Sequence, residues 1–279
     1  MGNSDIILRM RNTDCTILVT SCDAYQDVEE PFITLFRKYW PDCPFETVLL
    51  TETTETEGFD RIIKTGRGKT WSQMLVEALK QIETPYVLME MNDFMLAAPV
   101  DTANLLKRIE QMKQFDVANL RLIPNPPGQR PWRETDLLEM PKNTAYCVSC
   151  QTGIWQRDYL MGLAARNKSA WEFERYGSFM VGNESRPILV TPKREYPDVD
   201  TVHKGHWVPA GVQLLKANGI DYDYSRRGPQ TFTVRLREGF KSLIFALFPW
   251  TLIVRIQNLF NIGMKERHKP APRNTAQPG

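Results

Sequence analysis

Three polar side chains interrupt an apolar, strand-forming run in the stretch YVLMEMNDFMLAAP at residues 86–99. They are Glu90, Asn92 and Asp93. A buried carboxylate that lacks a partner costs several kcal/mol, so a ligand at the end of the strand would explain their presence. Mg²⁺ and Mn²⁺ bind carboxylate oxygens beside phosphate oxygens, and Asn92 with Asp93 would suit a cation that bridges two phosphates. The alternative is an Asn-Asp cap on the turn before Phe94.

Two further acids, Glu172 and Glu174 in WEFE, are candidates for a general base. A base must lie within hydrogen-bond reach of the hydroxyl that it deprotonates. In an extended segment both acids would lie on one side, whereas in a helix they would diverge by about 200° and only one would face a cleft. The alternative is a solvated acidic face beside Arg175.

Basic and imidazole side chains gather late in the chain. His203 and His206, in VHKGHW, could ligate a metal or contact a leaving pyrophosphate. Lys204, Arg226 and Arg227 could neutralise the same leaving group. Solvation at the surface is the alternative for all five.

Aromatic side chains could bind a sugar ring or a base by stacking. Trp155, Trp171 and Trp207 offer flat apolar faces for this. Since tryptophans more often fill a core, we take only Trp171 as a site residue.

Two tempting motifs do not carry chemistry. The run GRGKT at 66–70 ends like a phosphate-binding loop, but Ile63 stands where that motif requires glycine. Cys147 and Cys150 have metal-ligand spacing without a second pair, so buried structural thiols are expected.

Alternating strand and helix patterns must position these residues. Strands are predicted at 16–20, 45–50, 61–65, 86–91, 146–155 and 188–191, and helices at 28–39, 71–82, 101–115, 158–167 and 212–218, with a helix or ordered loop at 169–178. This order is typical of an α/β chain with a largely parallel sheet. Ligands of such sheets bind beyond the carboxyl ends of the strands, which is where Asp23 and Asn92 with Asp93 fall.

Five motifs follow one another along the chain: TILVTSCDAY, the helix entry at Trp71-Ser72, YVLMEMNDF, QTGIW and WEFE. Their order resembles bacterial GT-A glycosyltransferases that assemble cell-surface polysaccharides such as capsule, O-antigen and lipopolysaccharide. The resemblance covers roughly residues 14–227. It implies a GT-A-like, Rossmann-like fold in which a mostly parallel sheet is flanked by helices.

The resemblance also implies roles for individual residues. Donor contacts would come from Ser21, Asp23, Trp71, Asn92, Asp93, Lys204 and Arg226. A metal, Mg²⁺ or Mn²⁺, would be held by Asp93 and His203; Asn92 stands where an acid is usual, and one charge fewer weakens such a site. The base would be Glu174, which follows Trp-x-Phe, with Glu172 as the alternative, and the reaction would invert the anomeric carbon by single displacement.

Composition and charge limit the classes of function. The chain has 279 residues, 42% of them hydrophobic, which is enough for one sizeable core and an appendage. Its net charge of +2 provides no field that would gather nucleic acid, so no nucleic-acid partner is expected. Five cysteines and no apolar leader favour a reducing cytoplasm over a disulfide scaffold.

The basic, apolar stretch at 235–269 differs from the rest of the chain. Charges and Pro249 interrupt it, so it is a poor membrane span. Amphipathic helices that lie on an anionic membrane surface fit better, with a core or dimer helix as the alternative. The domain prediction is therefore a glycosyltransferase domain at 1–232, a basic amphipathic helical membrane-associating segment at 233–268 and a disordered tail at 269–279.

These features together predict a glycosyltransferase that is peripheral on the cytoplasmic face of the plasma membrane. It would move a sugar from a nucleotide-sugar donor to a hydroxyl of a lipid-linked surface glycan. A sugar nucleotidyltransferase is the first alternative, although SCDAYQD supplies no glycines for its phosphate loop. A non-catalytic, membrane-associated scaffold that binds nucleotide-sugar is the second.

Overall fold

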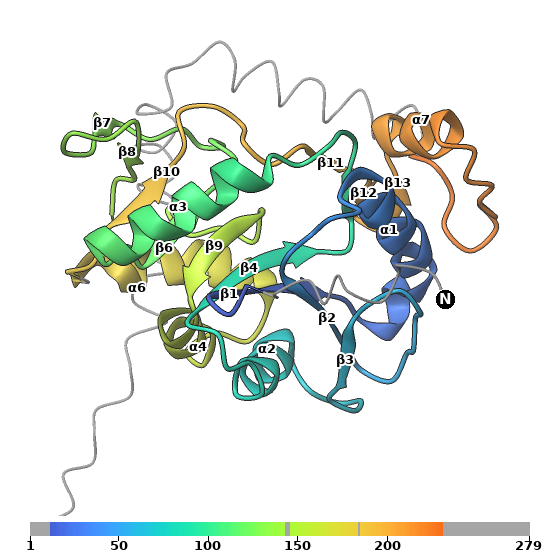
Figure 1. Ribbon diagram of the computed structural model, residues 1–279. Helices are drawn as coiled ribbons and strands as arrows, with labels where there is room; N and C mark the ends of the chain where they lie inside the picture. The colour runs from blue at the N-terminus through green and yellow to red at the C-terminus, as the bar shows by residue number, and fades with distance from the viewer. Residues whose placement is uncertain (1–11, 143–145, 184, 231–279) are drawn as a thin grey trace, which may run out of the picture. The chain divides into compact units, whose positions relative to one another are not determined.

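A nine-stranded mixed sheet forms the centre of the chain in the computed structural model, which describes residues 12–142, 146–183 and 185–230 (Figure 1). Its strands are β1 (Cys15–Thr20), β2 (Glu46–Thr51), β3 (Arg61–Lys64), β4 (Tyr86–Met91), β6 (Asn119–Arg121), β7 (Arg130–Pro131), β8 (Leu138–Glu139), β9 (Gly153–Gln156) and β10 (Ile188–Val190). Their spatial order is β3-β2-β1-β4-β9-β6-β10-β8-β7. Strands β3, β2, β1 and β4 are parallel neighbours, whereas β9 runs antiparallel between β4 and β6. The order 3-2-1-4 is Rossmann-like, and the predicted mostly parallel α/β sheet flanked by helices is confirmed.

Two short ribbons and ten helical segments complete the described residues. The ribbons are β5 (Phe94–Leu96) with β11 (Asp198–Asp200), and β12 (Val202–His203) with β13 (His206–Trp207). The α-helices are α1 (Gln26–Tyr39), α2 (Trp71–Leu79), α3 (Thr102–Phe115), α4 (Arg157–Ala164), α5 (Ala170–Glu172), α6 (Ser178–Met180) and α7 (Pro209–Ala217). The 3-10 turns η1 (Asp23–Tyr25) and η3 (Val181–Asn183) and a π-helix, η2 (Phe173–Gly177), are the rest.

Apolar side chains pack on both faces of the sheet, which is why its central strands are mostly apolar along their whole length. Along β1, Ile17 and Val19 join the core beneath α1 and α3, whereas Leu18 joins the core beneath α2 and α4. Figure 1 shows α3 on one side of the sheet and α2 with α4 on the other. Burial of both faces leaves the carboxyl ends of the strands as the place for polar groups.

The prediction of a strand over 146–155 is wrong for most of its length. Only Gly153–Gln156 forms a strand, because polar groups of the preceding residues bind other partners instead of a ladder. The Tyr146 carbonyl accepts from Arg121, and the Cys150 amide donates to Glu174. The segment at 169–178 is helical, so the extended alternative for the two glutamates is not adopted.

The predicted membrane-associating segment and tail, 233–279, lie outside the described residues. Among the residues described, no helix has the length and apolar character that crossing a bilayer requires.

Candidate functional site

The ends of β1, β2 and β3 meet at one edge of the sheet, around Asp23. Its carboxylate accepts hydrogen bonds from the amide and hydroxyl of Thr53 at 2.9 and 2.7 Å, and from Nε of Arg67 at 2.9 Å. The Asp23 amide in turn donates to Glu52 at 3.0 Å. The Thr53 hydroxyl, followed by Arg67, lowers the pKa of Asp23 to about 2. Asp23 is therefore ionised and ties three strand ends together, with the exposed Arg67 beside it.

Asn92 joins the end of β4 to the end of β1. Its side-chain amide donates to Ser21 Oγ at 3.0 Å and to the Tyr25 carbonyl at 3.1 Å. Ser21 Oγ then donates to Glu29 Oε1 at 2.6 Å. Asn92 is buried, so both bonds form away from water. The amide thus links two strand ends and does not cap the turn before Phe94.

Glu29, on α1, is fully buried and is surrounded by hydroxyl groups. In addition to the Ser21 hydroxyl, Thr54 Oγ1 donates a hydrogen bond to Glu29 Oε1 at 3.1 Å, and Thr56 Oγ1 donates one to Oε2 at 2.5 Å. Three hydroxyl donors satisfy this carboxylate without a cation among them. The network fixes α1 and the segment after β2 beneath the edge that carries Asn92.

Asp93, the next residue, has a different environment. Its Oδ1 is buried and has no hydrogen-bond partner among the described residues. Its backbone is nevertheless held firmly, because the amide and hydroxyl of Thr201 both donate to the Asp93 carbonyl, at 2.8 and 2.7 Å. Burial, and then the nearby Asp200, raise the pKa of Asp93 to about 7. The position is rigid, and the charge of Arg227 offsets only part of this rise in the pKa of Asp93.

The acids Asp198 and Asp200 approach Asp93 through the pairing of β11 with β5. In this antiparallel register Asp200 lies opposite Phe94, directly beside Asp93. Burial, followed by Asp198, raises the pKa of Asp200 to about 6. His203 Nδ1 lies 3.8 Å from Asp200 Oδ2, which places the predicted His203 at the outer side of this acid pair.

Glu90 is fully buried within β4 and is stabilised in its neutral form. Tyr196 donates its hydroxyl to Glu90 Oε2 at 3.1 Å, while Oε1 has no partner among the described residues. Burial and then Asp198 raise the pKa of Glu90 well above its usual range. Glu90 therefore lies behind the strand end as a protonated acid.

The arrangement around Asp93 fits a divalent cation that substrate oxygens help to bind. No cluster of three or more His, Cys, Asp or Glu side chains in the described ranges is already arranged as a metal site. Mg²⁺, however, commonly uses only one or two protein carboxylates and completes its shell with phosphates and water. The unpartnered Oδ1 of Asp93 and the neighbouring Asp200 suit that role, because a cation would offset their mutual repulsion.

Glu174 and Glu172 have different local environments. Ser149 Oγ and the Cys150 amide donate to Glu174 Oε1 at 2.9 and 2.8 Å. Glu172 Oε2 instead accepts from the Lys168 amide at 2.8 Å, at the start of its own helix. The structure thus directs Glu174 toward the end of the sheet and uses Glu172 as a helix cap.

The Cys150 thiol connects the donor and acceptor sides of the candidate site. It is buried, and its pKa is raised well above the usual range by burial, then by Glu174 and then by Asp93. Both carboxylates are therefore within electrostatic reach of one sulfur atom. Asp93 and Glu174, predicted separately from two motifs, thus both act on the Cys150 thiol.

The predicted basic residues divide between this edge and the surface. Arg226 donates to the Asp23 carbonyl at 3.2 Å, and Arg227 binds Asp27 at 3.0 Å with its guanidinium 4.2 Å from the centre of the Tyr25 ring. Lys204 lies in the turn between β12 and β13, with a φ of 51°. His206 is exposed, and its Nδ1 lies 3.4 Å from the Gly228 carbonyl oxygen. Arg226 thus reaches the Asp23 edge.

The tryptophans separate as expected. Trp155 and Trp207 are fully buried, whereas Trp171 is 61% exposed. Trp71, expected at the donor, begins α2 and packs its ring against Phe173, 5.4 Å between centroids. It therefore links α2 to the π-helix that carries Glu174.

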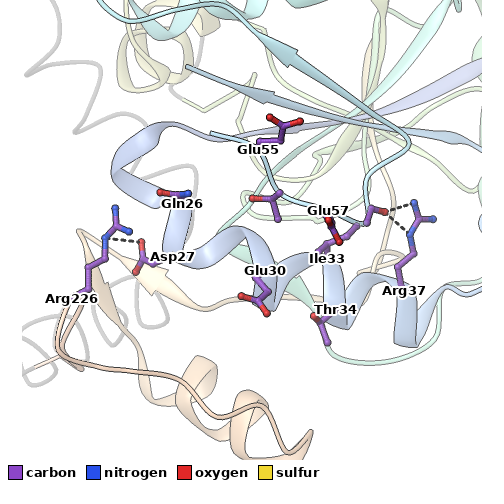
Figure 2. Close-up of a pocket in the computed structure, with 11 residues that line it drawn as sticks. Gln26, Asp27, Glu30, Ile33, Thr34, Arg37, Glu55, Glu57 and Arg226 are labelled. Carbon is purple, nitrogen blue, oxygen red and sulfur yellow. Dashed lines mark hydrogen bonds and ion pairs between the residues drawn. The ribbon is translucent and has the colours of Figure 1, made fainter. Parts of the chain in front are cut away.

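An open groove of about 820 Å³ lies beside α1, on the side shown in Figure 2. It is lined by Gln26, Asp27, Glu30, Ile33, Thr34, Arg37, Glu55, Thr56, Glu57, Gly58 and Arg226. Arg226 and Asp27 form an ion pair at one end, and Arg37 binds the Gly58 carbonyl at the other (Figure 2). Neither Asp93 nor Glu174 lines it, so we do not assign the reaction to this groove.

Sequence reasoning missed several residues of this edge. Glu29, Arg67 and Arg121 carry no local motif and come to the site through the sheet topology. Asp198 and Asp200 could have been found, because DVD alternates two acids at the period of a strand.

Comparisons with known proteins complete the description of the site. No protein-family profile matches the chain, and no curated protein matches it significantly. Among solved structures it is similar to S. aureus TarS, with 15% identity, a TM-score of 0.43 and coverage of 69% of this chain but only 37% of TarS. It is also similar to the mannosyltransferase PcManGT of Pyrobaculum calidifontis, solved with GDP-Man and Mn²⁺ (13% identity, TM-score 0.44, 71% of this chain and 59% of that one). A cytidylyltransferase from Leptospira borgpetersenii aligns over 79% of this chain and 99% of its own, with 13% identity and a TM-score of 0.44. At these values the similarities carry no argument about function, which we base on the chain's own residues.

Proposed function

We propose that the chain is a glycosyltransferase that uses a nucleotide-sugar donor. The observation that carries this proposal is the buried, unpartnered oxygen of Asp93 at the carboxyl end of a central parallel strand, with Asp200 beside it. Ligands of open α/β sheets bind at this edge, and an uncompensated carboxylate there calls for a cation. Diphosphates reach proteins as complexes with Mg²⁺ or Mn²⁺.

The donor would lie along the ends of β1 to β4. Asp93, with Asp200 and His203, would hold the cation and through it the diphosphate, while Asn92 would keep the strand end in place. Exposed Arg67 and Arg226 flank Asp23, where they can neutralise phosphate charge or contact the nucleoside.

Glu174 would act as the general base on the acceptor side. The acceptor hydroxyl oxygen forms a bond to the anomeric carbon as its proton passes to the Glu174 carboxylate. The bond between that carbon and the diphosphate oxygen breaks, and the nucleoside diphosphate leaves with the electron pair. Two hydrogen bonds to Oε1 fix the carboxylate, a geometry that favours proton transfer in a defined direction.

Calorimetric titration with nucleoside diphosphates tests the donor site. UDP, GDP, TDP and CDP would each be titrated with and without Mn²⁺ into the wild type, Asp93→Asn and Asp158→Asn. Asp158 is an exposed acid at the opposite edge of the sheet and serves as the matched control. We expect Mn²⁺-dependent binding of one nucleotide by the wild type and the control, and a loss of at least about tenfold in Asp93→Asn.

Other outcomes of this titration point elsewhere. Equal binding by Asp93→Asn and the wild type would remove Asp93 from the donor site. If CTP, titrated in the same way, binds in preference to the diphosphates and releases pyrophosphate when a sugar phosphate is added, a nucleotidyltransferase is favoured. No response to any nucleotide would favour a scaffold.

Two isosteric variants test the base. Glu174→Gln should abolish sugar transfer and leave nucleotide binding unchanged, because it removes the proton acceptor but keeps the side-chain shape. Glu172→Gln should keep transfer and only weaken the helix start. Transfer retained in Glu174→Gln but lost in Glu172→Gln would reverse the assignment.

The acceptor side of the proposal concerns surface glycans. We propose a hydroxyl of a lipid-linked glycan as the acceptor, with residues 233–268 holding the enzyme at an anionic membrane on its cytoplasmic face. Truncation after Gln230 should then release the protein from vesicles that contain phosphatidylglycerol. Unchanged association with those vesicles would contradict the membrane proposal and leave the donor proposal standing.

A further inference from the structure

Arg121, the last residue of β6, is a buried cation that the proposed reaction does not yet use. It is only 2% exposed. Its guanidinium donates to the Tyr146 carbonyl at 3.1 Å, to Gln151 Oε1 at 3.1 Å and to the Asn125 carbonyl. Its Nε is buried and has no hydrogen-bond partner within the described residues. Among the described residues, the Arg121 guanidinium donates hydrogen bonds to neutral acceptors and to no carboxylate.

A second buried arginine shows how unusual this is. Arg108, on α3, is 1% exposed and binds two acids directly, Asp136 at 2.7 Å and Glu195 at 2.5 Å. These acids raise the pKa of Arg108, whereas burial lowers the pKa of Arg121 to about 10. A buried charge without an ion pair costs several kcal/mol. The fold carries this cost at Arg121, whereas at Arg108 two ion pairs offset it.

The contacts of Arg121 clamp the segment 146–151 at both ends. Tyr146 accepts at the start of the segment and Gln151 at its end. Between them lie Ser149 and Cys150, the two donors that hold Glu174. By holding both ends of this segment, Arg121 fixes the Ser149 hydroxyl and the Cys150 amide, which in turn hold the Glu174 carboxylate.

The backbone of Tyr146 supports the same interpretation. Its φ is 61°, in the left-handed region that residues with a side chain rarely adopt. Such a conformation costs of the order of 1 kcal/mol or more and persists only where neighbouring contacts impose it. The bond from Arg121 to the Tyr146 carbonyl is one such contact.

Arg121 also acts on Glu174 through its charge. The charged and titratable groups around Glu174 are Arg121 from β6, Tyr146 and the Cys150 thiol from the clamped segment, and Arg175 on its own helix. The negative charge of Glu174 favours the protonated form of Arg121, so the two groups interact across the gap between elements.

We propose that Arg121 is the positioning residue of the acceptor-side base: it clamps the segment that holds Glu174 and supplies the opposite charge. This inference rests on the proposed glycosyltransferase function and deepens it. Arg121 has no contact with the reacting atoms in this arrangement, so its effect should fall on turnover and on its pH dependence rather than on donor affinity.

The test compares Arg121→Lys and Arg121→Met with Arg108→Lys, the matched buried arginine. The wild type and the variants would be assayed for sugar transfer with the nucleotide-sugar found by titration. We expect kcat to fall by about tenfold or more in both Arg121 variants, while the donor KM stays within about twofold. In Arg121→Met the pH profile of kcat should change, whereas in Arg108→Lys the melting temperature should fall and the pH profile should stay as in the wild type.

Hydrogen exchange gives a readout that does not depend on activity. Peptides that cover 146–151 should exchange faster in Arg121→Lys than in the wild type, and at wild-type rates in Arg108→Lys. Should Arg121→Met fail to fold, Arg121→Lys decides the question, because it keeps the charge and removes the fork of donors.

Failure of this inference is distinguishable from failure of the proposed function. A wild-type pH profile and wild-type exchange in Arg121→Lys and Arg121→Met would overturn the positioning role while transfer itself stands. Absence of any nucleotide-sugar turnover in the wild type would instead overturn the proposed function, and exchange over 146–151 would then still decide whether Arg121 clamps this segment.

Discussion

Carboxylates at the end of β1 and β2 accept hydrogen bonds from hydroxyl and amide groups, whereas those around β4 and β11 lie next to one another. We call the first group the hydrogen-bonded side; it comprises Asp23, Glu29 and Glu52. The second, the acid-crowded side, comprises Glu90, Asp93 and Asp200 together with Asp198, which also accepts a hydrogen bond from Thr152 and pairs with Arg194.

Asp23 and Asp93, one from each side, differ in the direction of their pKa shifts. On the hydrogen-bonded side, donors from Thr53 and Arg67 lower the pKa of Asp23 to about 2. On the acid-crowded side, burial and neighbouring acids raise the pKa of Asp93 to about 7. A satisfied carboxylate stabilises the fold on its own, whereas a crowded one needs a proton or a cation. The difference indicates which side is built as scaffold and which is built for a ligand.

Asn92→Asp should have the largest effect, because it places a further carboxylate at the residue that links the hydrogen-bonded side to the acid-crowded side. The new carboxylate would lose the donors to Ser21 and to the Tyr25 carbonyl and would face that carbonyl oxygen. We expect a loss of about 3 kcal/mol in the free energy of unfolding, measured by urea titration. Unchanged stability, together with tighter Mn²⁺ binding, would mean that position 92 serves the metal rather than the strand ends.

Gly211→Ala should displace Asp93 on the acid-crowded side indirectly, through its contact with Thr201. A Cβ at Gly211 would lie 2.5 Å from the Thr201 carbonyl oxygen, so the backbone there must shift. Thr201 fixes Asp93 through two hydrogen bonds, and the shift should therefore reach the donor site. We expect about 2 kcal/mol of destabilisation and weaker nucleotide binding, read by thermal unfolding and calorimetry. Gly162→Ala, where a Cβ meets open space, is the control. Equal losses of stability and of nucleotide binding in the two variants would show that Gly211 does not act on the donor site through Thr201.

The pH dependence of stability should differ in sign between the sides. Asp93 holds its proton in the folded state up to a pKa of about 7 but in the unfolded state only to about 3.8. Stability is therefore lost as pH rises through this window, by at most about 1.4 kcal/mol per pH unit. Asp23 has a lowered pKa, so its contribution is present above pH 3.8 and is lost as pH falls toward 2.

Unfolding free energies from pH 4 to pH 8 check this contrast. Asp93→Asn should flatten the decline with rising pH, because the amide does not titrate. Added Mn²⁺ with the nucleotide should also restore stability at pH 8 in the wild type. A decline of the same slope in Asp93→Asn would show that Asp93 is not the group responsible.

Local sequence patterns predicted much of the fold and part of the site. Apolar runs indicated the central strands, because a sheet covered on both faces needs apolar residues at every position. Polar residues directly after those runs marked the carboxyl edge, and so Asp23 and Asp93 could be found. Burial of Cys147 and Cys150 followed from spacing alone and is confirmed.

The remaining parts depend on pairings that sequence spacing does not encode. Asp200 lies beside Asp93 only through the register of β11 on β5. Arg121 bonds to Tyr146 and Gln151, on either side of the residues that hold Glu174, only because β6 and β9 are neighbours in the sheet. The different environments of Glu172 and Glu174 depend on the helical state of 169–178, since the same sequence allows an extended segment. The role of Asn92 stayed open because caps and metal sites use the same residue types.

The most direct test of the account is a crystal structure of the protein with Mn²⁺ and the nucleoside diphosphate that binds most tightly. The account predicts an anomalous manganese signal in contact with the Asp93 carboxylate and the diphosphate, with Glu174 facing the same region. Manganese and diphosphate bound away from Asp93, with its Oδ1 still unpartnered, would contradict it.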